Sequence, residues 1–158
     1  AQAIGIRGGA WADLGGETVT AQALTGGGAV SNGTLVVTEV LAPGDGAGAV
    51  GTLSVSNIVV GAGVRYEADY GGVASDSVAA SGTLTLQGGG TVQLDLHGQT
   101  RPFSDLVLFS FSALENGSNL AQWTVTGDRP AGYLTKLVVE GNTVRLAFVP
   151  NGTLILMK

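Results

Sequence analysis

Short apolar stretches that begin with glycine constrain the fold of this chain more than any other feature. The triplet Gly-Thr-Leu opens such a stretch four times, at residues 33–35, 51–53, 82–84 and 152–154. In these and related stretches Leu and Val alternate with Thr, Ser and Gln, which is the period of a strand with one buried face. Clusters of glycine separate them and favour turns. The pattern predicts an all-β chain of short strands.

The arrangement of the turns favours a solenoid over a sandwich. Only Glu140-Gly141-Asn142 has the form of a tight hairpin turn, whereas a sandwich needs several. We therefore predict a single all-β domain over residues 1–158, a short parallel β-helix with a C-terminal antiparallel hairpin or cap. Solenoid-like rungs are expected over 1–100, and closing strands over 101–158. A β-sandwich is the alternative. The best helical segment, 111–123, has a loop-like centre.

Composition excludes several classes of protein. Glycine supplies 27 of 158 residues and charged residues only 12%, about half the usual quarter, so disorder driven by charge is excluded. No apolar run reaches the length of about 18 residues that a membrane helix needs. With seven basic residues far apart and a net charge of −5, nucleic acid is not an expected partner. The absence of Cys excludes disulfides and thiolate metal sites.

Several segments resemble the β-helix repeats of bacterial autotransporter passengers. LAPGDGAGAVGTLSV (41–55), the preceding GGGAVSNGTLVVTEV (26–40) and ASDSVAASGTLTLQGGGTVQLDL (74–96) are similar to successive rungs of that family. The resemblance covers about residues 15–150, and the chain is far shorter than most passengers. It implies a secreted or cell-surface protein, and it implies that the predicted parallel β-helix (β-solenoid) is right-handed. Ala1 is interpreted as the start of a processed chain or as a chosen boundary of the sequence.

Polar residues give candidate sites but no catalytic constellation. Glu67 and Asp69 are expected on one strand face with Arg65. These carboxylates have two interpretations: a calcium or sugar site, to which Asp76 would contribute, or a plain solvated face. We favour the solvated face. Asp45 is expected in a turn, and the single histidine, His97, is expected to end a strand. We predict no catalytic residue, no cofactor site and no metal site, with calcium as a weak alternative. An enzyme of the polysaccharide lyase or glycosidase kind would need Glu67, Asp69, Asp76 or Asp95 to converge; we do not expect one.

Aromatic and glycosylation-type residues also have two interpretations. A carbohydrate-stacking platform would need five aromatic residues to gather, but core or cap packing is favoured for Trp123. The candidates are Trp11, Tyr66, Tyr70, Trp123 and Tyr133. Asn-Gly-Thr/Ser triplets match the acceptor pattern for glycosylation, yet in a solenoid they are expected at corners. They begin at Asn32, Asn116 and Asn151.

The apolar end of the chain points to self-association. The last residues, NGTLILMK, repeat the form of the internal rung NGTLVVTE, and so apolar a strand needs burial within its own domain or in another subunit. We predict a self-assembly interface formed by Leu154, Ile155, Leu156, Met157, Ile4 and Ile6. The predicted function is a subunit of a secreted filament or surface layer, with head-to-tail copies of itself as partners. A surface adhesin or carbohydrate-binding passenger fragment, with a surface polysaccharide as partner, is the alternative.

Overall fold

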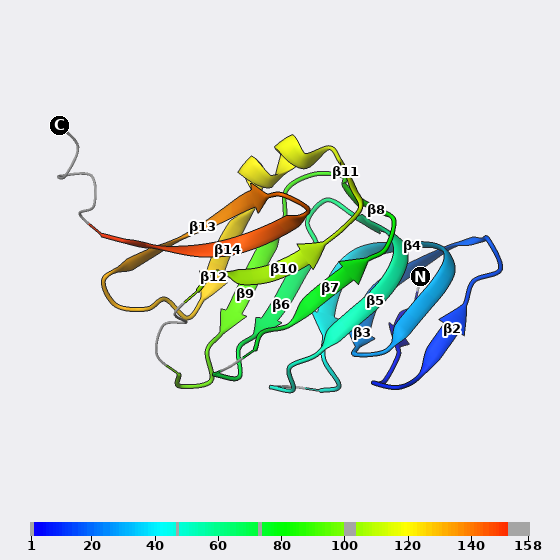
Figure 1. Cartoon of the computed structure of the whole chain (residues 1–158), viewed down its shortest axis with the longest axis horizontal. Helices are drawn as coiled ribbons and strands as arrows, with labels where there is room; N and C mark the ends of the chain where they lie inside the picture. The colour runs from blue at the N-terminus through cyan, green and yellow to red at the C-terminus, as the bar shows by residue number, and fades with distance from the viewer. Residues whose placement is uncertain (1, 47, 73, 100–103, 152–158) are drawn as a thin grey trace.

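A nearly closed, barrel-like sheet of mixed parallel and antiparallel strands forms the protein, seen here in a computed structural model (Figure 1). The structure describes residues 2–46, 48–72, 74–99 and 104–151. Its strands are β1 (Ala3–Gly5), β2 (Trp11–Asp13), β3 (Thr18–Gly26), β4 (Ala29–Pro43), β5 (Thr52–Val60), β6 (Arg65–Asp69), β7 (Ser77–Ala80), β8 (Thr83–Leu86), β9 (Thr91–Asp95), β10 (Leu106–Ser110), β11 (Ala113–Glu115), β12 (Thr124–Gly127), β13 (Tyr133–Glu140) and β14 (Thr143–Pro150). A 3₁₀ helix, η1 (Gly117–Gln122), lies between β11 and β12. The prediction of an all-β fold is confirmed.

Most strands pair in parallel, and the pairs form three ladders. The first ladder joins β2, the start of β4, the start of β5, β7 and β10. The second joins the start of β3, the middle of β4, the end of β5, β8 and β11. The third joins β1, the ends of β3 and β4, β6, β9 and β12. Every described strand belongs to one sheet, unlike the two sheets of the alternative sandwich.

Alternation along each strand places apolar side chains inside the ladders. In the third ladder Leu41 pairs with Tyr66 and Tyr66 with Val92, and all three side chains are buried. In the first ladder Leu53 pairs with Val78, which is also buried. Each such side chain contributes about 1.5–3 kcal/mol when it is removed from water. The buried side chains therefore form one core inside the ladders, and this core includes residues from Ile6 near one end of the chain to Leu146 in β14.

The Gly-Thr-Leu triplets fall on two different ladders, which explains their uneven spacing. Residues 33–35 and 82–84 open strands of the second ladder, while residues 51–53 open a strand of the first. The fourth triplet lies outside the described residues. The spacing between triplets therefore does not measure the offset between neighbouring strands, which is 25 residues where Thr52 meets Ser77.

The antiparallel part of the fold begins later than residue 100. β10, β11 and β12 still pair in parallel with β7, β8 and β9, so the expected boundary at residue 100 falls inside the ladders. Only β13 and β14 form a hairpin, at the predicted turn 140–142, and β14 pairs antiparallel with β10. η1 occupies the loop-like centre of segment 111–123. Among the described residues, no helical segment has the length and apolar character that crossing a membrane requires.

Candidate functional site

The polar residues of the third ladder gather where β6 and β9 end. The register sets Asp69 directly beside Asp95, and both carboxylates point outward because the alternating residues Tyr66 and Ala68 are buried. The prediction that Glu67 and Asp69 share a face with Arg65 is confirmed. Arg65 forms an exposed ion pair of 2.6 Å with Glu67, a kind of contact that adds little stability.

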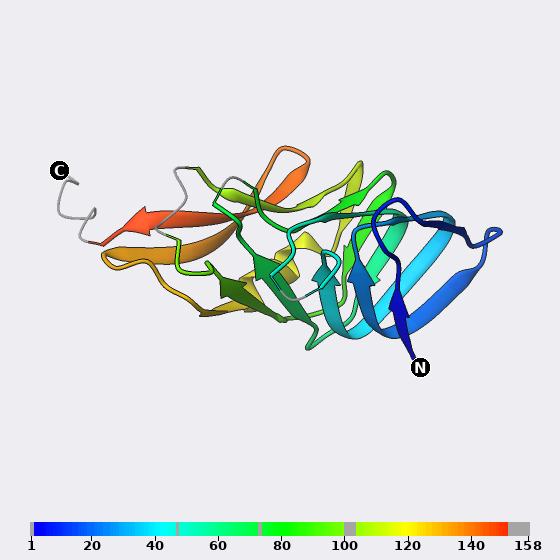
Figure 2. The ribbon, with the colours of Figure 1, turned by 90° about the horizontal axis from the view of Figure 1, so that it is seen from below.

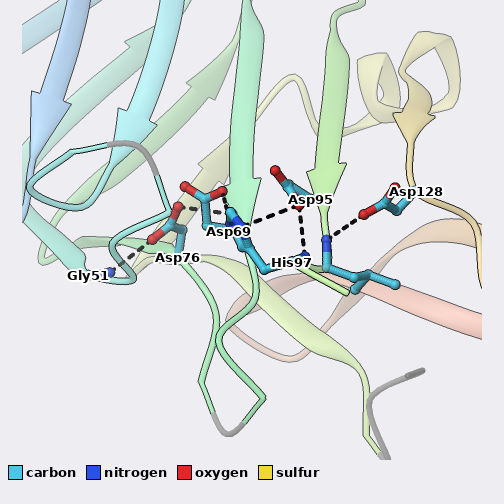
Figure 3. A network of polar contacts seen from close by, with 7 residues as sticks. Gly51, Asp69, Asp76, Asp95, His97 and Asp128 are labelled. Carbon is cyan, nitrogen blue, oxygen red and sulfur yellow. Dashed lines mark hydrogen bonds and ion pairs between the residues drawn. The ribbon is translucent and has the colours of Figure 1, made fainter. Parts of the chain in front are cut away.

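His97 connects the two strand ends. It follows β9 in a turn with a positive φ of 49°, and its backbone N–H donates to Asp95 Oδ1 at 2.8 Å. The imidazole turns back over β6, so that Nε2 lies 2.7 Å from Asp69 Oδ1 and Nδ1 lies 3.5 Å from Asp95 Oδ1. Figure 3 shows the ring between the two carboxylates. One histidine thus reduces the repulsion between two aspartates that the register forces together.

The histidine lines a surface hollow of about 320 Å³ together with both aspartates, Glu67 and Gln93. A second hollow, of about 390 Å³, shares Glu67 and Asp69 and extends toward Arg7 and Asp45. Three of the four carboxylates considered for an enzyme, those of Glu67, Asp69 and Asp95, therefore line one surface. All three already have a basic neighbour, which is Arg65 for Glu67 and His97 for the two aspartates.

The hydrogen bond that the His97 imidazole donates to Asp69 is the main cause that raises the pKa of His97 above its usual 6.5, and the charges of Asp95, Asp69 and Asp128 add to it. Because the folded-state pKa is raised, the pairing of His97 with Asp69 stabilises the fold fully below pH 6.5, and this stabilisation is lost as pH rises through the raised pKa.

In an NMR titration of this single histidine we expect a midpoint above 6.5. Asp69→Asn should bring the midpoint back toward 6.5, whereas Glu67→Gln, on the same strand face, should leave it unchanged. An Asp69→Asn midpoint equal to that of the parent would contradict the assignment.

Asp76 lies under this surface and is fully buried. Its Oδ1 accepts the Gly51 N–H at 2.8 Å and its Oδ2 accepts the Asp69 N–H at 3.0 Å (Figure 3). Burial raises the pKa of Asp76 to about 7, although the two backbone bonds act in the opposite direction. Asp76 thus binds the backbone of two segments and does not line the surface hollow, although the neighbouring carboxyl group of Asp69 also raises its pKa.

Two further aspartates bind backbone N–H groups of distant segments in the same way. Asp45 accepts the Gly8 N–H at 2.9 Å and the Gly27 N–H at 3.0 Å, and Asp128 accepts the Leu96 N–H at 2.8 Å. The prediction of a turn at Asp45 is correct, and its carboxylate also joins that turn to two other turns. The backbone N–H groups that these aspartates accept give each carboxylate a structural role.

Asp69, Asp95 and His97 are also the described residues best placed to hold a metal ion. Each offers one ligand atom, and the three atoms lie within 4.8 Å of one another. Two carboxylates and one imidazole suit a divalent transition metal better than Ca²⁺, which prefers about six to eight oxygen ligands. A metal would have to displace the hydrogen bond between His97 and Asp69. The present contacts are those of a histidine paired with two aspartates.

The remaining predicted residues do not gather into a site. Tyr66, Tyr70 and Trp123 are buried, so the five aromatic residues form no common platform, and the prediction of core packing for Trp123 is confirmed. Asn32 and Asn116 both have positive φ, at 55° and 57°, as expected for corners, and Asn151 lies in a turn.

The predicted self-assembly residues have different surroundings. Ile6 belongs to the core, so its side chain is occupied within the chain, while Ile4 is partly buried in the end strand β1. Leu154, Ile155, Leu156 and Met157 lie outside the described residues.

No protein-family model matches the chain, and no curated protein matches it. The resemblance to autotransporter passengers therefore stays a prediction, and functional inference depends on the structure itself.

Proposed function

We propose that the chain is a structural subunit, a short right-handed parallel β-helix that assembles with copies of itself into an extracellular filament or surface layer. Three parallel ladders support the β-helix, because within each ladder a strand pairs with the strand that follows one turn of the chain later. In the middle of the chain this offset is 24 residues at Asn32 and Ser56, 25 at Thr52 and Ser77 and 26 at Asn57 and Thr83. Parallel crossovers are right-handed in nearly all proteins.

The observation that carries the assembly proposal is the open state of the ladder ends. β1 and β2 are terminal strands at one end, and β12 and β13 are terminal strands at the other; each pairs with a single strand of the described sheet. Strands at the end of a ladder are templates for another strand. Among the described residues, the large apolar side chains that are exposed lie on these strands: Trp11 (70%) on β2, and Leu134 (50%) and Val139 (46%) on β13.

The two ends lie at opposite extremes of the molecule (Figure 1 and Figure 2). Exposed apolar groups on opposite ends favour a head-to-tail contact, which extends without closing unless its rotation generates a ring. The Asn151 N–H donates to the Gly132 carbonyl at 2.9 Å, so the last described residue lies beside the start of β13. A carbohydrate-binding fragment has less support, because Tyr66, Tyr70 and Trp123 are buried.

Light scattering across a concentration series, with negative-stain microscopy, tests this function. We expect the parent protein to assemble as concentration rises. Trp11→Ser removes one exposed aromatic ring whose burial contributes about 2 kcal/mol, so the apparent dissociation constant should rise about 30-fold. Arg65→Ser, which changes an exposed side chain away from the ends, is the matched control and should assemble like the parent. A parent protein that stays monomeric at every concentration would overturn the proposal.

A further inference from the structure

We propose that Asn116 is a site of spontaneous modification, at which the folded chain closes a succinimide ring onto the backbone nitrogen of Gly117 and loses ammonia. The same dipeptide at Asn32-Gly33 is protected by the fold. This inference goes beyond the proposed assembly and does not depend on it.

The reaction uses the two residues and water. The Gly117 nitrogen gives up its proton to the solvent and attacks the side-chain carbonyl carbon of Asn116, so that a new C–N bond closes a five-membered ring. The amide nitrogen takes up a proton and leaves as ammonia. Water then opens the ring at one of its two carbonyl carbons, which gives aspartate or isoaspartate. Glycine favours the attack because no Cβ hinders its nitrogen and its backbone rotates freely.

Two Asn-Gly pairs of the described chain have similar local surroundings. Asn32 and Asn116 are each followed by glycine and then by Thr or Ser, and both side chains are exposed. Both residues also have positive φ, at 55° and 57°. A third pair begins at Asn151 and continues outside the described residues. Sequence, exposure and φ therefore do not distinguish the first two pairs, but their hydrogen bonds do.

The side chain of Asn32 is held by a charged acceptor. Its Nδ2 donates to Asp13 Oδ1 at 3.0 Å, across the first ladder. This nitrogen is the atom that would leave as ammonia, so ring closure at Asn32 breaks the bond. Hydrogen bonds to charged groups are stronger than those between neutral groups. The contact with Asp13 therefore slows the reaction at Asn32.

The backbone around Asn32 is held as well. Its N–H donates to Ser56 Oγ at 2.9 Å, and its carbonyl accepts the Gly16 N–H at 2.7 Å. Gly33 is closely packed, since an added Cβ would overlap the Glu17 carbonyl oxygen. Ring closure would need the peptide between Asn32 and Gly33 to rotate, and these contacts with neighbouring segments oppose the rotation.

Asn116 lacks these restraints. Among the described residues its side chain has no hydrogen-bond partner, and neither has the Gly117 N–H. The Asn116 carbonyl accepts only the Asn119 N–H, at 3.0 Å, in the first turn of η1. An added Cβ at Gly117 would meet only the end of the flexible Leu114 side chain. The amide of Asn116 is therefore free to turn toward the Gly117 nitrogen.

Contacts further along η1 confine the change to this corner. Asn119 Nδ2 donates to the Leu86 carbonyl at 2.7 Å, and Trp123 Nε1 donates to the Gly88 carbonyl at 3.0 Å. Ring opening at Asn116 adds one negative charge to the net charge of −5. We expect the modified protein to stay folded and to separate as a more acidic species in ion-exchange chromatography.

Peptide mass spectrometry after incubation at mildly alkaline pH tests the site, because each peptide gains mass when its amide becomes an acid. In the folded parent, Asn116 should react at least about tenfold faster than Asn32, since reaction at Asn32 breaks a hydrogen bond to a charged group. In guanidinium chloride the two rates should agree within about twofold, because only sequence neighbours remain. Equal rates in the folded protein, or the same ratio in denaturant, would overturn protection by the fold.

Substitution of the attacking residue tests the ring closure. Gly117→Ala should slow the reaction at Asn116 by at least about tenfold, because a Cβ hinders the nitrogen. Ser118→Ala keeps the Asn-Gly pair and is the matched control, so it should react at about the parent rate. A Gly117→Ala protein that reacts at the parent rate would show that Asn116 is hydrolysed directly, which overturns the proposed ring closure.

Removal of the acceptor tests the protection of Asn32. Asp13→Ala should raise the rate at Asn32 several-fold and leave the rate at Asn116 unchanged. Asp13→Asn retains an acceptor oxygen without the charge, so its effect should be smaller. Circular dichroism of both variants establishes that they are folded. An unchanged rate at Asn32 in folded Asp13→Ala would overturn the role of Asp13.

Discussion

Gly26→Ala is expected to destabilise the protein by about 3–5 kcal/mol, more than a typical single substitution. Gly26 ends β3 with a φ of 111°, a conformation that alone costs an L residue about 1–2 kcal/mol. An added Cβ would also overlap the Ile6 carbonyl oxygen, which accepts the Gly28 N–H at 2.8 Å. Ile6 would have to leave its place in the core.

Gly63→Ala is the matched control for this substitution. Its φ of 82° is also positive, but a Cβ there would meet no atom within 4 Å. We expect it to cost only the conformational part, about 1–2 kcal/mol. Thermal or denaturant unfolding measures both variants. If Gly26→Ala is too unstable for equilibrium unfolding, hydrogen exchange should show lost protection at Ile6 and Leu24. Equal stability of the two variants would contradict the predicted overlap.

Asp76→Ala is expected to cost about 2–4 kcal/mol at pH 5, because it leaves the N–H groups of Gly51 and Asp69 without their buried acceptor. Asp45→Ala is the control, since this exposed residue also accepts two backbone N–H groups, from Gly8 and Gly27. Water can replace the carboxylate at Asp45, so we expect a loss of only about 1 kcal/mol. Chemical denaturation at fixed pH measures both. Equal losses of unfolding free energy in the two variants would show that burial of the acceptor does not determine how much its removal destabilises the protein.

The effect of Asp76 should depend on pH. Its folded-state pKa of about 7 lies above the usual 3.8, so the folded protein holds the proton that the unfolded chain has lost. The free energy of unfolding of the parent should therefore fall as pH rises from about 4 to 7. Asp76→Ala removes this contribution, so the difference between the two proteins should be largest near pH 4–5 and smaller at pH 8. A difference that is independent of pH would refute the raised pKa.

Local sequence was sufficient to predict strands and their inner faces. In VRYEADY the alternation assigns Tyr66 and Ala68 to one side and Glu67 and Asp69 to the other, and the structure agrees. The hairpin at residues 140–142 was also predictable, because Gly141 in a tight turn is a local signal. Strand period and turn chemistry depend on residues close together in the chain, so both can be predicted before the fold is known.

The register between strands was not predictable, and the site depends on it. The contact of His97 with Asp69 joins residues 28 apart, and no local pattern states that β9 lies beside β6 with Asp95 opposite Asp69. Asp76 was considered as a possible surface carboxylate for the same reason. Its burial is caused by its neighbours, since one of its two N–H donors, Gly51, lies 25 residues away.

The separation in sequence between neighbouring strands grows along the chain, while their spacing in the sheet stays near 5 Å. Bonded residues lie 17 apart at Ala21 and Thr38, 25 apart at Thr52 and Ser77, and 32 apart at Leu96 and Asp128. The longer separations in sequence result from longer connecting segments between the ladders. The chain therefore tolerates connections of varied length, and a peptide inserted at Gly63, where the surroundings are open, should leave the ladders in place.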